Sequence, residues 1–311
     1  MHVAVASHHR LPVHGYGGAQ RVVVALVRGL AALGHRVTLL AQPGTKVAEA
    51  AKVVEVPPKT LKNAGADLTP FIPAGAEILH AHFPLKQGPT SIPFVQTLHG
   101  NWKPGTALPP NTIFLSGDHA RRHGSETFVY NGLDPAEYIL RRRKEQWDLF
   151  LGRLHSDRGY HWAVEAAKKT GRRLIIAGGW RPSFTGAIKY VGEVDGKRKA
   201  VLLARARCLW MPAQWDEPFG LPTIEALFSG TPVLGTRRGA LPEILTPAVG
   251  AVCTTLEEML TAAEQISTRD PMACRARAER HFTHLHMAES YVRMYQGLLA
   301  NKTLLPGLSA D

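Results

Sequence analysis

Two glutamates, Glu217 and Glu225, lie eight positions apart in the segment EPFGLPTIE and carry the strongest chemical signal in the sequence. Pro222 suits the first position of a helix, which would leave the amides of the preceding loop and of the first turn without helical partners. Unpaired amides at a helix start attract anions. We expect Glu225, on that first turn, to accept hydrogen bonds from ligand hydroxyls. The segment therefore predicts a site that binds hydroxyls through carboxylates and phosphate through amides.

A purely structural explanation of Glu225 is also open, because a glutamate near a helix start complements the helix dipole. A capping box would place a glutamate there too, but it needs Ser, Thr, Asp or Asn three residues earlier, and that position is Pro222. We therefore favour the interpretation in which the segment binds a ligand.

The elements that must position these residues follow an alternating pattern. Short runs of Val, Ile and Leu alternate with longer segments of helical period, which is typical of βαβ units and a parallel sheet. The first half predicts strands over residues 3–6, 36–41, 77–81, 94–98 and 112–116, with a helix over 19–33. The second half predicts strands over 147–151, 172–177 and 208–211, with helices over 162–170, 197–206 and from 222. The predicted fold class is α/β, with two Rossmann-like parallel-sheet domains facing a central cleft.

A basic run separates the two halves. Arg141, Arg142, Arg143 and Lys144 interrupt the pattern just before the strand at 147. We place the first domain at 1–143 and the second at 144–285. We expect residues 286–311 to contain a final helix that returns to the first domain.

Composition limits the classes of partner and compartment. Lys and Arg number 37 against 25 Asp and Glu, a net charge of +12 that favours an anionic partner. The three cysteines show no CxxC spacing, so we expect neither a disulfide framework nor a zinc ribbon, and a reducing cytoplasm is the expected compartment. No run of eighteen apolar residues and no signal-peptide pattern occurs, so we expect neither a membrane span nor secretion.

The EPFGLPTIE segment resembles the E-x7-E motif of retaining glycosyltransferases of the GT-B fold, and the sequence around it resembles glycosyltransferase family 4. Residues 152–159, GRLHSDRG, are similar to that family's G-R-L-x-x-x-K-G, in which the Arg and the Lys bind the donor diphosphate. The resemblance assigns this role to Arg153 and Arg158. Arg158 departs from the usual Lys, but it keeps the charge and reaches phosphate through a bidentate fork.

In the first half, residues 15–18, GYGG, resemble the family's glycine-rich loop, which lies against the donor phosphates and the acceptor. Gly17 and Gly18 carry no Cβ, so the backbone can approach a ligand closely and its amides become donors. An alternative is that these glycines only permit a tight turn.

Three histidines fall at the ends of predicted strands. His99 ends one of them, at the place where a parallel sheet presents residues to a crevice. It matches the family's strand-end histidine, which faces the donor sugar. His80 and His82 end another strand, and we interpret them as packing residues and not as metal ligands.

The resemblance implies that a sugar is transferred from a nucleoside diphosphate to an acceptor hydroxyl with retention of configuration, and that no metal or other cofactor is needed. The implied diphosphate ligands are Arg153, Arg158 and the amides near Leu221 to Thr223, because they can stabilise the negative charge that grows there. The implied sugar ligands are Glu217, His99 and the amides of Phe219 and Gly220, and Glu225 is assigned to the ribose hydroxyls.

Other classes stay open at this stage, namely a nucleotide-sugar epimerase of the GT-B fold and a catalytically silent nucleotide-sugar binder. No Asp-x-Asp occurs, and the histidines near the C-terminus lack metal-ligand spacing, so no metal site is expected. The basic clusters accompany no RNP, helix-turn-helix or zinc-finger pattern, so we expect no nucleic-acid partner. Two explanations of the basic clusters remain. They form a solvated face, or they contact an anionic membrane surface peripherally at the inner face of the membrane.

Overall fold

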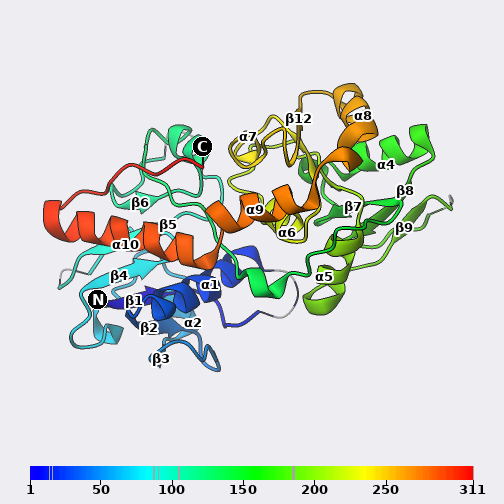
Figure 1. Ribbon diagram of the computed structural model, residues 1–311. Helices are drawn as coiled ribbons and strands as arrows, with labels where there is room; N and C mark the ends of the chain where they lie inside the picture. The colour runs from blue at the N-terminus through cyan, green and yellow to red at the C-terminus, as the bar shows by residue number, and fades with distance from the viewer. Residues whose placement is uncertain are drawn as a thin grey trace. The chain divides into compact units, whose positions relative to one another are not determined.

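The computed structural model describes residues 1–311 except 14, 16, 87, 90, 104, 105, 184, 185 and 311. The chain divides into two compact units, shown in Figure 1. Unit 1 comprises Met1–Leu133 and Thr283–Ser309, and unit 2 comprises Asp134–Phe282 with Ala310. Each unit is built on a six-stranded sheet in which every pairing between strands is parallel, so the predicted α/β fold class is confirmed.

The sheet of unit 1 has the strand order β3-β2-β1-β4-β5-β6. Its strands are β1 (His2–Ala6), β2 (Arg36–Ala41), β3 (Lys52–Glu55), β4 (Ile78–Ala81), β5 (Phe94–Thr97) and β6 (Thr112–Ile113). Its helices are α1 (Gly18–Ala32), α2 (Pro58–Leu61), α3 (Gly117–Arg121) and α10 (His284–Asn301), with the 3-10 turn η1 (Thr69–Phe71). The order reverses between β1 and β4, and ligands of open parallel sheets bind outside the carboxyl ends of the strands at such a point.

The sheet of unit 2 has the order β12-β11-β10-β7-β8-β9, with its reversal between β7 and β10. Its strands are β7 (Trp147–Leu151), β8 (Arg173–Ala177), β9 (Ile188–Tyr190), β10 (Leu209–Met211), β11 (Val233–Thr236) and β12 (Gly250–Cys253). Its helices are α4 (Tyr160–Thr170), α5 (Gly196–Arg205), α6 (Leu221–Phe228), α7 (Leu241–Ile244), α8 (Leu256–Gln265) and α9 (Pro271–His281), with 3-10 turns η2 (Pro135–Glu137), η3 (Ser156–Arg158) and η4 (Ile266–Thr268).

The two units divide after Leu133, ten residues before the expected boundary. The segment that follows belongs to unit 2 because it packs there: the Tyr138 ring stacks on Phe228 with centroids 5.4 Å apart, and the Arg275 guanidinium donates to the carbonyls of Pro135 and Tyr138. Helix α10 lies in unit 1, where it packs against α1 so closely that a Cβ on Gly29 would fall 2.4 Å from the carbonyl oxygen of His284.

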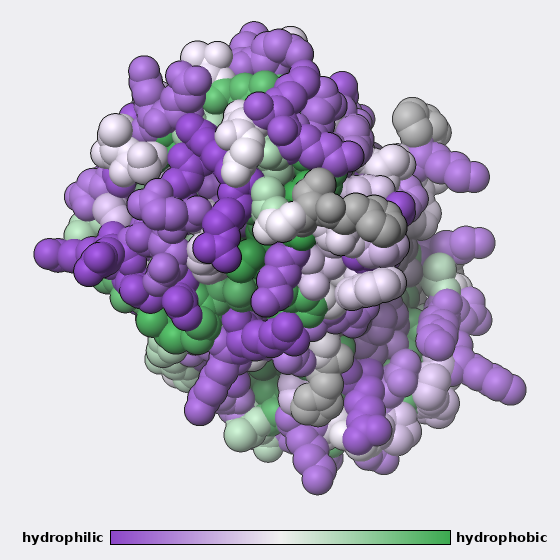
Figure 2. All heavy atoms as spheres, turned by 90° about the vertical axis from the view of Figure 1, so that its right-hand side faces the viewer, coloured by the Kyte–Doolittle hydropathy of each residue, from purple (hydrophilic) through white to green (hydrophobic). Residues whose placement is uncertain are grey.

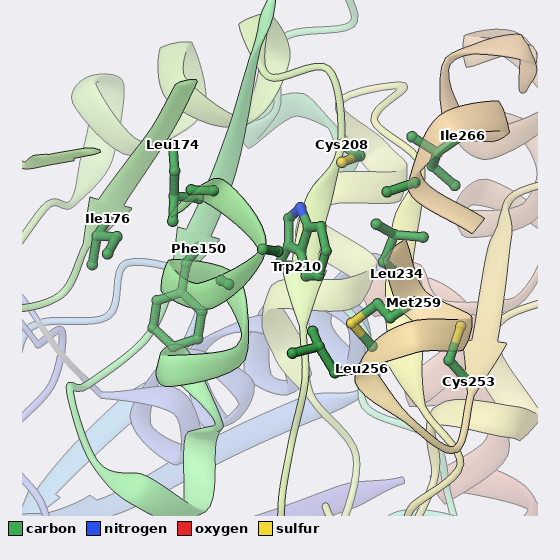
Figure 3. Close-up of a cluster of buried hydrophobic side chains, with 14 of the residues drawn as sticks. Phe150, Leu174, Ile176, Cys208, Trp210, Leu234, Cys253, Leu256, Met259 and Ile266 are labelled. Carbon is green, nitrogen blue, oxygen red and sulfur yellow. The ribbon is translucent and has the colours of Figure 1, made fainter. Parts of the chain in front are cut away.

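A buried cluster on one face of the unit 2 sheet brings together side chains from β7, β10 and α8, among them Phe150, Trp210 and Met259 (Figure 3). Beside it, the Asp148 carboxylate is 3 % exposed and accepts two hydrogen bonds from the Arg207 guanidinium, at 2.7 and 2.8 Å, and one from Trp210 Nε1 at 3.0 Å. The ion pair anchors the start of β7 to the segment that leads into β10.

We expect Asp148→Ala to lower the free energy of unfolding by about 3–5 kcal/mol, because it leaves the half-buried Arg207 charge and the Trp210 N–H without their acceptor. Urea denaturation checks this. Glu165→Gln, which breaks the exposed pair between Glu165 and Lys169 on α4, is the control and should change stability very little. Equal stability of the two variants would contradict the structural role of Asp148.

Candidate active site

The EPFGLPTIE segment forms the loop into α6 and most of that helix. Gly220 caps the helix in the left-handed region with φ 88°, Leu221 is the first helical residue and Pro222 is the second. Two expectations were therefore wrong. Pro222 was expected to be the first residue of the helix and is the second. Glu225 was expected on the first turn and is the fifth helical residue, on the second turn. No acidic residue lies in the first turn of α6, so the helix dipole does not explain Glu225.

Glu217 is 6 % exposed and sits at the centre of a cluster of donors. Its Oε2 accepts hydrogen bonds from Arg158 at 2.5 Å and from Trp215 Nε1 at 3.0 Å. The backbone amides of Phe219 and Gly220 also donate to its carboxyl group. These two amides were expected to hold the donor sugar, and in this structure they hold Glu217.

The groups around Glu217 have opposing effects on the pKa of its carboxyl group. Burial raises the pKa of the Glu217 carboxyl above its ordinary value, while the Arg158 charge and the hydrogen bonds oppose that rise. The Arg158 guanidinium also lies over the Trp215 ring, 4.8 Å from its centroid. The aromatic ring and the carboxylate together fix the position of Arg158.

Because the pKa of Glu217 is raised on folding, its ionisation costs stability as pH rises through the unfolded value of about 4.3. The cost is complete once pH exceeds the folded pKa. We expect the stability of Glu217→Gln relative to the native chain to increase as pH rises from 4 to 8, because the variant has nothing to ionise there. Thermal unfolding of both proteins across this range checks the prediction, and a pH-independent difference would contradict it.

Residues 152–159 connect β7 to α4 and pack closely against the loop that leads to Glu217. Gly159, with φ +68°, approaches so closely that a Cβ would fall 1.7 Å from the carbonyl oxygen of Pro212. The backbone amide of Gln214 donates a hydrogen bond to the backbone carbonyl of Asp157 at 2.7 Å. Only glycine tolerates both the left-handed backbone and this contact. The final glycine of GRLHSDRG therefore sets the distance between Arg158 and Glu217.

Arg153 differs from Arg158 although both lie in the same loop. The Arg153 side chain is exposed and forms no hydrogen bond or ion pair with the described residues. The structure therefore pairs Arg158 with Glu217, whereas the Arg153 side chain, in the same loop, is exposed to solvent.

Glu225 is 2 % exposed and lies in an ion pair that the sequence did not reveal. Its Oε1 accepts from Lys199 Nζ at 2.7 Å and from the Tyr138 hydroxyl at 3.0 Å. Lys199 lies on α5, 26 positions before Glu225, and Tyr138 lies 87 positions before it. The sequence around Lys199 and Tyr138 does not indicate that they contact Glu225, because Lys199 belongs to an ordinary basic run and Tyr138 follows a turn.

Thr223 is fully buried, and its hydroxyl has no hydrogen-bond partner among the described residues. The oxygen lies 3.3 Å from the place where a Cβ on Gly220 would stand, beside Glu217 Cγ. Leu221, between these two residues, is half-buried. The start of α6 thus carries an unused buried hydroxyl next to the Glu217 cluster.

The remaining predicted residues lie in unit 1. His99 follows β5 and is half-buried, and burial lowers its pKa to about 4. Gly18 is the first residue of α1. Gly17 has an extended backbone, and a Cβ there would meet Val13 at 2.6 Å, so close packing requires this glycine. Tyr16, within the same loop, lies outside the described residues.

The structure therefore assembles Glu217, Arg158, Phe219, Gly220 and Thr223 into one cluster at the start of α6. Glu225 stands one turn further along that helix with its own partners, and Arg153 lies on the loop that carries Arg158. Gly17, Gly18 and His99 belong to unit 1.

Across the described ranges, no group of three or more His, Cys, Asp or Glu side chains is placed to hold a metal ion. In the same part of the chain, every helix is too short or too polar to cross a membrane. Hydrophilic side chains cover most of the face shown in Figure 2, with smaller apolar areas between them.

Two units with parallel six-stranded sheets, one of which carries a buried E-x7-E cluster at a helix start, define the GT-B fold. Two family models match the chain: Glycosyltransferase Family 4 over residues 16–135 and Glycosyl transferases group 1 over residues 146–268. The chain belongs to glycosyltransferase family 4, as the sequence motifs predicted.

Similar proteins span both curated sequences and solved structures. The glycogen synthase of Mycobacterium tuberculosis is 30 % identical over 174 residues, which cover 49 % of this chain and 42 % of that protein. The phosphatidyl-myo-inositol mannosyltransferase of Propionibacterium freudenreichii is 27 % identical over 138 residues, 40 % of this chain and 36 % of its own. The chain thus matches less than half the length of these relatives.

Among solved structures, AviGT4, a glycosyltransferase involved in avilamycin A biosynthesis, superposes with a TM-score of 0.79 and 29 % identity, covering 96 % of this chain and 98 % of its own. The Anabaena protein HepE, solved with UDP-glucose, has a TM-score of 0.68 at 13 % identity, covering 96 % of this chain and all of its own. The latter likeness concerns the fold alone.

Proposed function

We propose that this protein transfers a sugar from a nucleoside diphosphate to an acceptor hydroxyl, with retention of anomeric configuration and without a bound metal. The observation that carries the proposal is the ion pair between buried Glu217 and half-buried Arg158 at the start of α6, one turn before buried Glu225. A carboxylate this deeply buried, with a cation beside it, is a costly arrangement that ligand chemistry accounts for.

Negative charge develops on the diphosphate as the bond to the sugar breaks, and cations already in place lower that barrier. Arg158 has five N–H donors, and Glu217 takes one of them through Nη1. The exposed Arg153 supplies a second cation, and the amides near Leu221 to Thr223 supply dipoles at a helix start. These groups supply the charge that a metal provides in glycosyltransferases with an Asp-x-Asp motif, which this sequence lacks.

The sugar acquires positive, oxocarbenium-like character in the same step. Glu217 is suited to hold a sugar hydroxyl and to stabilise that charge, and we also propose His99 as a sugar ligand. Glu225 accepts hydrogen bonds from the ribose hydroxyls, and Lys199 stays paired with its Oε1. In the proposed step the acceptor oxygen attacks on the face that the leaving phosphate vacates, and that phosphate takes the acceptor proton.

The names of the relatives and the ligand of one solved structure support a proposal for the donor. A glycogen synthase and a mannosyltransferase are among them, and HepE was solved with UDP-glucose. We propose a nucleoside diphosphate sugar as the donor on this basis, together with an acceptor hydroxyl on a glycan, a lipid-linked molecule or a small molecule.

The test uses the purified full chain with a panel of nucleoside diphosphate sugars in the presence of a chelator, with and without pooled acceptors. Release of nucleoside diphosphate is followed for the native chain and for Glu217→Gln. Acceptor-dependent release that survives chelation and is lost in the variant supports the proposal. Conversion of the donor without release would establish an epimerase, and thermal stabilisation by a donor without turnover would establish a silent binder.

We expect Glu225→Gln to raise the donor KM about 10- to 100-fold with little change in kcat, because a hydrogen bond to a charged group is lost in the ground state and the transition state alike. Steady-state kinetics at varied donor concentration measure KM and kcat separately. Tyr138→Phe is the matched control: it removes one hydrogen bond to Glu225 and keeps the ring stack on Phe228, so it should raise KM less. A fall in kcat at unchanged KM would contradict the assignment of Glu225 to the ribose.

A further inference from the structure

Two histidine rings of unit 1 share a hydrogen bond at the carboxyl edge of its sheet. His82 Nδ1 lies 2.8 Å from His99 Nε2, and the two rings are stacked with centroids 5.1 Å apart. His82 follows β4 and His99 follows β5, and these strands are neighbours in the sheet. The bond therefore joins two adjacent strand ends, beside the reversal point of the strand order.

Both rings are neutral near pH 7. Burial lowers the pKa of His99 to about 4 and holds the pKa of His82 well below its ordinary value, and nearby histidines, among them His8, oppose a charge on either ring. A neutral imidazole carries one N–H and one bare nitrogen. The bond between the rings therefore allows two arrangements, one with His82 as the donor and one with His99 as the donor.

The second nitrogen of His82 distinguishes these arrangements. His82 Nε2 is buried and has no hydrogen-bond partner among the described residues, and the His80 ring lies against His82 with centroids 4.1 Å apart. If His99 were the donor, His82 would carry its proton on Nε2, where no protein acceptor meets it. Buried N–H groups without an acceptor are rare and costly. The packing therefore favours the arrangement in which His82 Nδ1 donates.

We propose that His82 is a positioning residue that fixes His99 as the tautomer with its proton on Nδ1, the nitrogen that the bond to His82 does not use. Among the described residues, His99 Nδ1 has no hydrogen-bond acceptor for its proton. Resting on the proposed function, His99 then donates a hydrogen bond to an oxygen of the bound donor sugar and does not serve as a base.

The test measures the tautomer directly in the full chain labelled with 15N-histidine, by long-range proton–nitrogen correlation spectra. His99→Gln identifies the signals of His99. In the native protein we expect a protonated Nδ1 and a bare Nε2 on His99. In His82→Leu, which removes the donor, we expect the His99 proton to shift toward Nε2. In His82→Asn, whose side-chain amide replaces the Nδ1 donor, we expect the native tautomer to return.

His80→Gln is the control, because His80 lies in the same core and bonds to Tyr295 and Thr97 but not to His99. It should leave the His99 tautomer unchanged. A native His99 with its proton on Nε2, or a folded His82→Leu protein with unchanged His99 signals, would overturn the proposal. If His82→Leu does not fold, the native spectrum alone decides.

Turnover provides the functional readout. We expect His82→Leu to lower kcat about five- to tenfold, the effect of one lost hydrogen bond, and His82→Asn to restore most of it. Turnover in His82→Leu equal to that of the native chain would overturn the positioning role. If the native chain shows the expected tautomer and yet turns over no nucleotide sugar, the proposed function fails and the tautomer assignment stands.

Discussion

Arg158→Ala should lower kcat for sugar transfer by about 10²–10³-fold, the effect of removing one preorganised donor from a charge that develops in the transition state. The loss has a second cause in this protein, because Arg158 is also the cation that opposes the rise in the pKa of buried Glu217. Without it, the pKa of the Glu217 carboxyl rises further. Steady-state kinetics at several pH values measure both effects.

Two variants serve as controls for this prediction. Arg158→Lys keeps a positive charge and matches the usual residue of the family motif, so it should retain much of the activity. Arg153→Ala removes the exposed cation without touching Glu217, so it should lower kcat with no change in the pH profile. If Arg158→Ala raises the donor KM and leaves kcat unchanged, the charge is needed for binding only and the proposed role in the reaction is wrong.

Gly239→Ala should lower kcat/KM by about 10²-fold or more while the protein stays folded. Gly239 follows β11 with φ +58°, and a Cβ there would fall 2.2 Å from the carbonyl oxygen and 2.4 Å from the nitrogen of Glu217. The next amide, that of Ala240, donates to the same carbonyl at 2.9 Å. A methyl group must therefore displace the backbone that carries Glu217, and displacements of about 1 Å can cost 10²-fold in rate.

Gly171→Ala is the matched control because Gly171 has nearly the same backbone, with φ +66°, at the C-terminal end of α4, where a Cβ would meet no atom within 4 Å. Both variants carry the left-handed strain of about 1–2 kcal/mol, and only Gly239→Ala adds the contact with Glu217. Similar activities in the two variants would show that Gly239 does not position the site.

Much of the fold could be predicted because hydrophobic period is a local property. The expected strands over 147–151 and 208–211 correspond to β7 and β10. The sequence pattern did not predict β3, β9, β11 or β12. Of these, β3 and β9 lie at the edges of their sheets and are largely half-buried or exposed, whereas β11 is internal and fully buried. Edge strands carry less of the apolar signal on which period analysis depends.

The candidate site was predictable only as far as its motif extends along the chain. Glu217 and Glu225 were found by their spacing, but Lys199 and Tyr138 reach Glu225 through tertiary packing and have no local pattern. The same limit explains Gly239, whose contact with Glu217 exists only after β11 and the α6 loop have folded together. The start of α6 was misplaced by one residue, because a Gly-capped helix begins without the side-chain cap that marks such a position.

The most direct test of the account is the proton NMR spectrum of a reaction with the donor that the panel identifies, recorded in the presence of a chelator. The coupling of the anomeric proton in the product reports its configuration relative to the donor. We expect a new glycoside with the configuration of the donor, formed by the native chain and not by Glu217→Gln. An inverted product, or a glycoside that forms only when a metal ion is supplied, would contradict it.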